Sequence, residues 1–83
     1  MKKKEIKILL VDDEQDILEI VGYNLAQEGY QIVTAINGKE AVLKAKKELP
    51  HLIIMDVMMP EMDGIEACEH IRKIPELSNV IVA

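Results

Sequence analysis

Short apolar runs rich in β-branched residues alternate with segments of helical period, and this alternation limits the fold more than any other feature of the chain. Runs of this length and composition are typical of strands buried on both faces. Strands that alternate with helices pair in parallel, because each helix carries the chain back to the starting edge of the sheet. The sequence therefore predicts an α/β domain. Its strands are expected at residues 6–11, 31–36, 52–55 and 80–82.

The segments between these strands have the apolar spacing of amphipathic helices. Asn37, followed by Glu40, has the spacing of a helix capping box. In the helix that follows, Val42, Ala45 and Leu49 are expected to face inward. Proline or glycine follows each helical segment, as is usual where a helix ends. The helices are expected at residues 14–27, 39–49 and 64–74.

The order of the elements limits the sheet to few topologies. Crossovers between parallel strands are right-handed in nearly all cases. If the second strand lies on one side of the first and the third on the other, the strand order is 2-1-3-4. The first helix then covers one face of an open, doubly wound sheet, and the second and third helices cover the other. Binding sites of such sheets lie at the carboxyl ends of the strands, where the order reverses. Here that point lies between the first and third strands.

Length and charge narrow the class of protein. The 83 residues allow a single domain, with residues 1–5 as a basic tail and 6–83 as the folded part. The formal net charge of −5 argues against direct nucleic-acid binding by this segment. No apolar stretch reaches membrane-spanning length. The single cysteine, Cys68, cannot form an intrachain disulfide, which fits a cytoplasmic setting.

Acidic residues follow two of the expected strands. Asp12 and Asp13 come directly after the first strand, and Asp56 comes directly after the third. Parallel strands bring these carboxylates to one edge of the sheet, where they repel one another unless a cation or a lysine lies nearby. Carboxylate oxygens suit magnesium, which takes one or two of them and keeps several waters. Asp13 and Asp56 are therefore candidate metal ligands.

Asp56 also has a candidate role as a nucleophile. An aspartate carboxylate can attack phosphorus to give an aspartyl phosphate, and a bound cation offsets charge on the transferring group. Acidic residues after a strand are, however, often helix N-caps. Asp12 or Asp13 could have that role alone, and Asp63 is expected to cap the third helix.

Two segments together closely resemble the bacterial response-regulator receiver domain. They are Leu-Val-Asp-Asp-Glu at residues 10–14 and Ile-Met-Asp-Val-Met-Met-Pro-Glu-Met-Asp-Gly at residues 54–64. Gly29-Tyr30, Ala35 and the turn at residues 37–41 also resemble that family. The resemblance covers residues 6–83. It implies a flavodoxin-like fold, present here as a partial (βα)3β unit that stops after the fourth strand.

The resemblance also implies roles for individual residues. Asp56 would be the phosphoacceptor and would also contact the metal. Asp13 would bind Mg²⁺, with Asp12 helping directly or through a water molecule. Met58 would offer its backbone carbonyl oxygen to the same ion. The expected function is thus a phospho-receiver module of a two-component phosphorelay, with no catalytic residue beyond Asp56.

Two further expectations come from the family. Pro60 and Gly64 would shape the loop and the entry to the third helix. A sensor histidine kinase would donate the phosphoryl group, and phosphorylation would shift the domain between two conformations. The chain is therefore expected to act as a signalling domain and not as an enzyme.

The chain departs from the family pattern at its C-terminal end. Receiver domains continue with a switch serine or threonine and a phosphate-contacting lysine, which have no counterpart in the 83 residues. Loss of one such electrostatic partner commonly costs on the order of 100-fold in rate, so impaired activity is expected. An apolar edge at residues 80–82 and an uncovered sheet face would favour self-association.

Two other functions stay open on the sequence alone. One is a truncated or engineered receiver fragment that keeps the motif but serves only as a noncatalytic folding or assembly unit. The other is a phosphohydrolase-like α/β fragment with an aspartate nucleophile. That class usually has a second aspartate two residues past the nucleophile as acid and base. Met58 occupies this position and argues against it.

Overall fold

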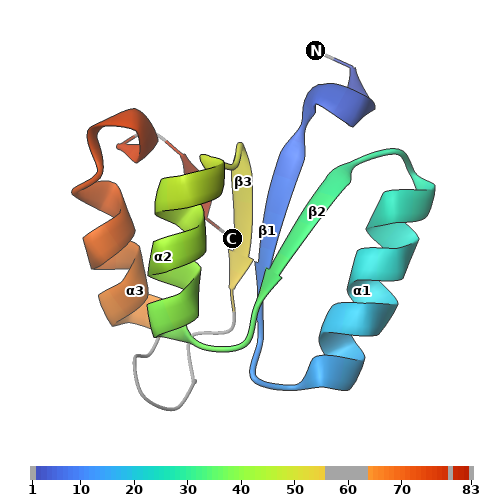
Figure 1. Cartoon of the computed structure of the whole chain (residues 1–83), viewed down its shortest axis with the longest axis horizontal. Coiled ribbons are helices and arrows are strands. Elements are labelled where there is room, and N and C mark those ends of the chain that lie inside the picture. Colours follow the sequence, from blue (N-terminus) through green and yellow to red (C-terminus); the bar gives the residue numbers. More distant parts are fainter. Residues whose placement is uncertain (1, 56–63, 79, 83) are drawn as a thin grey trace.

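A four-stranded parallel sheet forms the centre of the protein, as the computed structural model shows for residues 2–55, 64–78 and 80–82 (Figure 1). Its strand order is β2-β1-β3-β4, which confirms the predicted order. Every pairing is parallel, with β1 between β2 and β3. The strands are β1 (Lys7–Val11), β2 (Gln31–Ala35), β3 (Leu52–Met55) and β4 (Ile81–Val82).

Helices cover both faces of the sheet, with one helix on one face and two on the other (Figure 1). Helix α1 lies alone on one face, whereas α2 and α3 lie side by side on the other, as predicted. None of the helices in the described part of the chain has the length and hydropathy needed to cross a membrane. The helices are α1 (Gln15–Gln27), α2 (Gly38–Glu48) and α3 (Gly64–Arg72), with 3-10 turns at Lys3–Glu5 and Pro75–Leu77.

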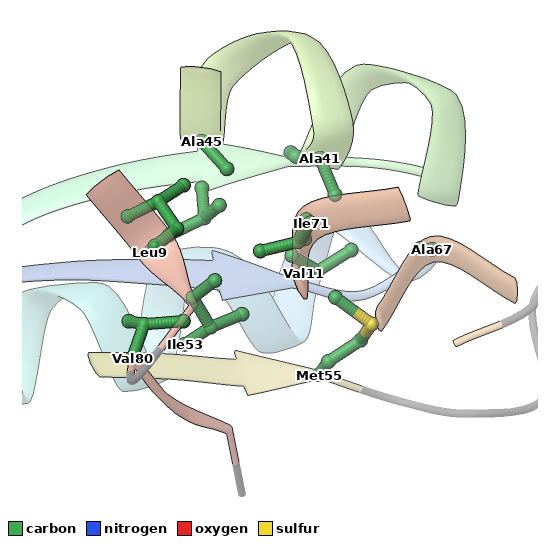
Figure 2. Close-up of a cluster of buried hydrophobic side chains, with 11 residues drawn as sticks. Leu9, Val11, Ala41, Ala45, Ile53, Met55, Ala67, Ile71 and Val80 are labelled. Carbon is green, nitrogen blue, oxygen red and sulfur yellow. The ribbon is translucent and has the colours of Figure 1, made fainter. Parts of the chain in front are cut away.

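The face beneath α2 and α3 holds the larger hydrophobic core (Figure 2). Successive strand residues point to opposite faces, so Leu9 and Val11 of β1 meet Ile53 and Met55 of β3 here. Helices α2 and α3 contribute three alanines, which let their backbones lie close to the sheet, together with the larger Ile71 of α3. The buried set is Leu9, Val11, Ala35, Ala41, Ala45, Ile53, Met55, Ala67, Ile71, Leu77 and Val80.

The face beneath α1 is less completely covered. Among the described residues, its cluster has Ile8, Leu10 and Leu18 as buried members, and the residues packed around them keep part of their surface in water. On the same side, Ile81 of β4 is 65% exposed. A hollow of about 410 Å³ separates α1 from β3 and β4. It is lined by Ile6, Ile8, Leu25, Tyr30, His51, Leu52, Ile54 and Ile81.

The predicted cap of α2 is present. The Asn37 side chain accepts a hydrogen bond of 2.8 Å from the backbone N–H of Glu40. The Glu40 carboxylate in turn accepts one of 3.3 Å from the backbone N–H of Ile36, one residue earlier than in the usual capping box. Glu40 also pairs with Lys44 at 3.3 Å, and the Lys44 ammonium donates to the Thr34 carbonyl. These contacts fix the start of α2 against the end of β2.

The end of α2 differs from the prediction. The helix stops at Glu48, and Leu49 takes a left-handed conformation with φ of 48°. Its N–H donates to the Ala45 carbonyl, as a left-handed cap does. The reversal leaves Leu49 43% exposed, so the expectation that it faces inward was wrong. The cause is the turn itself, which must redirect the chain within a few residues to reach β3.

Polar contacts tie α2 and β3 to the amino end of β1. The Lys7 ammonium lies 2.9 Å from a Glu48 carboxylate oxygen and 3.3 Å from the Glu48 carbonyl oxygen. The backbone N–H of Lys7 donates to His51 Nδ1, while the N–H of His51 donates to the Lys7 carbonyl. The hydrogen bond and the charge of Lys7 lower the pKa of the Glu48 carboxyl below its usual value.

Candidate functional site

The candidate site lies at the carboxyl ends of β1 and β3. Val11 and Met55 end these strands and are register partners. Asp12 and Asp13 directly follow Val11, and Asp56 directly follows Met55 in the sequence. Of the predicted site residues, Asp12, Asp13 and the helix start at Gly64 belong to the described structure. The predictions for Asp56, Met58, Pro60 and the Asp63 cap fall outside the described residues.

Asp12 is fixed by its backbone and by its side chain. Its N–H donates to the Ala35 carbonyl at 3.1 Å, which extends the pairing of β1 with β2 by one residue. Its Oδ1 accepts a hydrogen bond of 2.9 Å from the backbone N–H of Glu14. This bond, two residues along the chain, is the pattern of an Asx turn. The half-buried carboxylate is therefore held at the rim of the sheet.

Neither aspartate takes the N-cap position of α1. That position belongs to Glu14, whose backbone carbonyl accepts hydrogen bonds from the N–H groups of Ile17 and Leu18. Asp13 is exposed, and within the described part of the chain its carboxylate has no hydrogen bond or ion pair. Helix capping therefore does not account for Asp13.

The sequence around the two aspartates is rich in carboxylates. The sequence has no lysine or arginine from Ile8 to Gly38, and the same stretch holds six carboxylates. Among the described residues, none of the ion pairs involves Asp12 or Asp13. The amino terminus of α1 offers a partial positive charge, worth roughly 0.3–1 kcal/mol to a nearby carboxylate. A bound cation would offset repulsion between these carboxylates.

The donor set suits a hard cation. Asp12 and Asp13 offer carboxylate oxygens, and magnesium typically takes one or two carboxylates with water in its remaining positions. Within residues 2–55, 64–78 and 80–82, no group of three or more His, Cys, Asp or Glu side chains could hold a metal ion. The described part thus contributes two oxygen donors, and the other predicted ligands, Asp56 and Met58, lie outside it.

An apolar hollow adjoins Asp12 on the α1 side of the sheet. Its volume is about 250 Å³. An apolar wall of this kind lowers the local dielectric, so that charges at the rim interact more strongly than they would in open water. Asp12 is the charged residue among those that line it: Leu10, Val11, Asp12, Ile17, Leu18, Val21, Ile54 and Met55.

Comparison with known proteins supplies the family. Residues 8–83 match the family model described as the response regulator receiver domain. This chain belongs to the response-regulator receiver domain family. It is 51% identical over 67 residues to the alkaline phosphatase synthesis transcriptional regulatory protein PhoP of Bacillus subtilis. The match covers 81% of this chain and 28% of PhoP, so the chain spans less than a third of that relative.

Solved receiver structures have the same fold. The chemotaxis response regulator CheY4 of Vibrio cholerae superposes with a TM-score of 0.89 at 36% identity, over 93% of this chain and 64% of CheY4. The response regulator TrrA of Thermotoga maritima, solved in complex with Mg²⁺ and BeF, has a TM-score of 0.77 at 44% identity. That match covers 82% of this chain and 59% of TrrA.

The family assignment favours one of the functions that the sequence left open. The matched residues and the fold show that the chain is a receiver domain of the kind found in two-component systems. The noncatalytic fragment and the phosphohydrolase-like fragment are not favoured. The flavodoxin-like architecture and the strand order agree with the same assignment.

Proposed function

We propose that this receiver domain accepts a phosphoryl group on Asp56. The observation that carries the proposal is the pairing of Val11 with Met55 at the last position of β1 and β3. The residues joined to these two are Asp12 and Asp56. Because consecutive Cα atoms are only about 3.8 Å apart, this pairing supports a site shared by Asp12, Asp13 and Asp56.

The proposed step is a transfer between two oxygen atoms when acetyl phosphate is the donor. A carboxylate oxygen of Asp56 forms a bond to phosphorus, and the bond from phosphorus to the donor oxygen breaks. The leaving acetate keeps the electron pair of that bond. When bound, Mg²⁺ would offset charge on the transferring group. Asp12, Asp13, Asp56 and the Met58 carbonyl would hold the ion.

We assign residues 6–83 to the receiver part and residues 1–5 to an N-terminal tail. The tail is short, and Lys3 within it forms an ion pair of 3.3 Å with Glu28 at the end of α1. Pro60 and Gly64 would set the path of the chain into α3. Phosphoryl transfer would be the whole chemistry of the domain, with no turnover of a small-molecule substrate.

The physiological donor in this proposal is a sensor histidine kinase, acting in the cytoplasm. Family membership supports the kinase as partner. This segment would not contact nucleic acid directly. The net charge of −5 opposes it. PhoP is named a transcriptional regulator, but the match covers only 28% of PhoP, so that name does not assign nucleic-acid binding to this segment.

We also propose that the 83-residue chain self-associates through its α1 face. The support is the exposure of Ile81, at 65%, beside half-buried Leu52 and Ile54 over the 410 Å³ hollow. Within the described residues, β4 pairs only with β3. A strand edge of this kind can pair with a second copy, whose apolar face would remove the hollow from water.

Phosphoacceptance can be tested by intact-protein mass spectrometry after incubation with acetyl phosphate and MgCl₂. We expect one phosphoryl adduct that is labile in base and disappears in Asp56→Asn. Asp13→Asn should reduce the adduct and its dependence on Mg²⁺. Asp16→Asn, an exposed carboxylate in the first turn of α1, is the matched control and should leave the adduct unchanged. An adduct that persists in Asp56→Asn would contradict the assignment.

A further inference from the structure

A groove lies between α2 and α3, towards the ends of both helices. The two helices pack side by side (Figure 1). Each begins after the carboxyl end of a strand and runs back, so the groove lies at the opposite edge of the sheet from Asp12. Its volume is about 450 Å³, and it is lined by Val42, Lys46, His70, Lys73, Ile74, Pro75 and Glu76.

The groove has an apolar floor and basic banks. Val42 and Ile74 are half-buried and pack against the main core, so they are fixed in position. Lys46 on α2 is exposed on one bank. His70 and Lys73 are exposed on the other. An apolar side chain could thus enter between two cations without moving the backbone.

The charge of this groove is opposite to that of the chain. The whole sequence carries −5, yet the groove lining holds two lysines and a histidine against one carboxylate, Glu76. Among the described residues, neither Lys46 nor Lys73 has an ion-pair partner. Local charge of this sign attracts a negatively charged partner and repels a basic one.

A purely structural role for the two lysines would be to neutralise the carboxyl ends of α2 and α3. Lys7 does this for α2, because its ammonium donates to the carbonyl of Glu48. In the described part of the chain, the ammonium groups of Lys46 and Lys73 make no such hydrogen bond. Both ammonium groups are therefore available to a ligand in the groove.

We propose that this groove binds an acidic peptide segment of a partner protein. An apolar side chain of the peptide would lie on Val42, Ile74 and Pro75. Carboxylates on either side of it would pair with Lys46 and Lys73, in the manner of a helix or strand docked into a surface groove. Single-stranded nucleic acid fits less well, because the lining has no tyrosine, tryptophan or phenylalanine on which bases could stack.

The test is a titration of the isotope-labelled chain with a synthetic peptide in which two leucines are flanked by glutamates. We expect saturable amide shifts confined to the ends of α2 and α3. Lys46→Glu combined with Lys73→Glu should weaken binding by about tenfold or more. A tenfold loss corresponds to about 1.4 kcal/mol of binding free energy. Raising the salt concentration should weaken it further, because the banks are solvent-exposed.

Lys47→Glu is the matched control, because Lys47 is an exposed neighbour on α2 that does not line the groove. It should change the affinity less than twofold. A peptide with glutamine in place of glutamate should bind more weakly than the acidic one. Equal loss of binding with Lys47→Glu would overturn the proposal, as would shifts centred elsewhere, tighter binding of an oligonucleotide or no saturable binding. Circular dichroism of each variant separates loss of binding from loss of fold.

Discussion

The two faces of the sheet are built from the same strands but are covered very differently. On one face, α2 and α3 bring Ala41, Ala45 and Ala67 against the sheet, and all three are fully buried. On the other, α1 stands alone beside a row of half-buried aliphatic residues and two hollows. The difference is one of coverage and not of strand composition, because β1 and β3 supply aliphatic side chains to both faces.

One face of the sheet therefore contributes most of the hydrophobic stabilisation, and the other leaves apolar surface accessible to solvent. Most of the buried apolar surface, and hence most of the hydrophobic contribution to folding, belongs to the α2–α3 face. On the α1 face, Ile81 belongs to the sheet itself and is still 65% exposed. Apolar surface of that kind is available for contact with another chain.

The largest predicted difference is in the free energy of unfolding, between alanine substitutions of two neighbouring isoleucines of β3. Ile53 is fully buried on the α2–α3 face, and Ile54 is half-buried on the α1 face. Ile53→Ala should lower the free energy of unfolding by about 2–5 kcal/mol. Ile54→Ala should cost only about 1 kcal/mol, since less surface leaves water there on folding. Urea unfolding followed by circular dichroism measures both. Equal losses would show that the two faces contribute alike.

A second prediction concerns association through the α1 face. Ile81→Lys should lower the mass of the species seen by size-exclusion chromatography with light scattering. Its effect on the free energy of unfolding should be within about 0.5 kcal/mol, as for most exposed positions. Leu43→Lys is the control, since Leu43 is 67% exposed on α2 of the other face. A dilute, well-folded monomer of the unaltered chain would rule out self-association.

The smallest predicted effect distinguishes two ion pairs. Lys7–Glu48 joins β1 to α2, with side chains 26% and 30% exposed, whereas Lys3–Glu28 is 54% and 64% exposed. Because Lys7 lowers the pKa of Glu48, the stabilisation is complete above pH 4.5, the ordinary value, and is lost as the pH falls through the lowered one. Lys7→Met should therefore flatten the acid limb of the stability curve, measured by urea unfolding at several pH values. The same change from Lys3→Met would contradict this.

The sequence predicts the fold well where periodicity decides it. The alternation of strands and helices led to the strand order, and the spacing of Asn37 and Glu40 led to the α2 cap. Leu49 was misplaced, because its apolar character matched the helical period while the tight turn into β3 required a left-handed residue. The contact of Lys7 with Glu48 was not predicted. A lysine at the start of an apolar strand was the only signal for it.

Chain order predicted that Asp12, Asp13 and Asp56 share one edge of the sheet, whereas the role of Met58 came from the family resemblance. Parallel pairing brings the residues after Val11 and Met55 to one edge, so Asp12 and Asp13 could be placed without side-chain detail. The hydrogen bond that the Asp12 carboxylate accepts from the N–H of Glu14 could not be predicted. A carboxylate at this position can either cap a helix or close an Asx turn with the same sequence. The groove between α2 and α3 was also missed, since it depends on how two helices pack.

The central place of β1 leads us to expect one order of strand pairing during folding. Its residue Lys7 pairs with Gln31 on one side, and Ile8 pairs with Leu52 on the other. The first pairing closes the shorter loop and costs less chain entropy. The pairing of β1 with β2 is therefore expected to form before that of β1 with β3. Closure of the main core, however, waits for β3, which has to join the exposed side of a strand that is already paired.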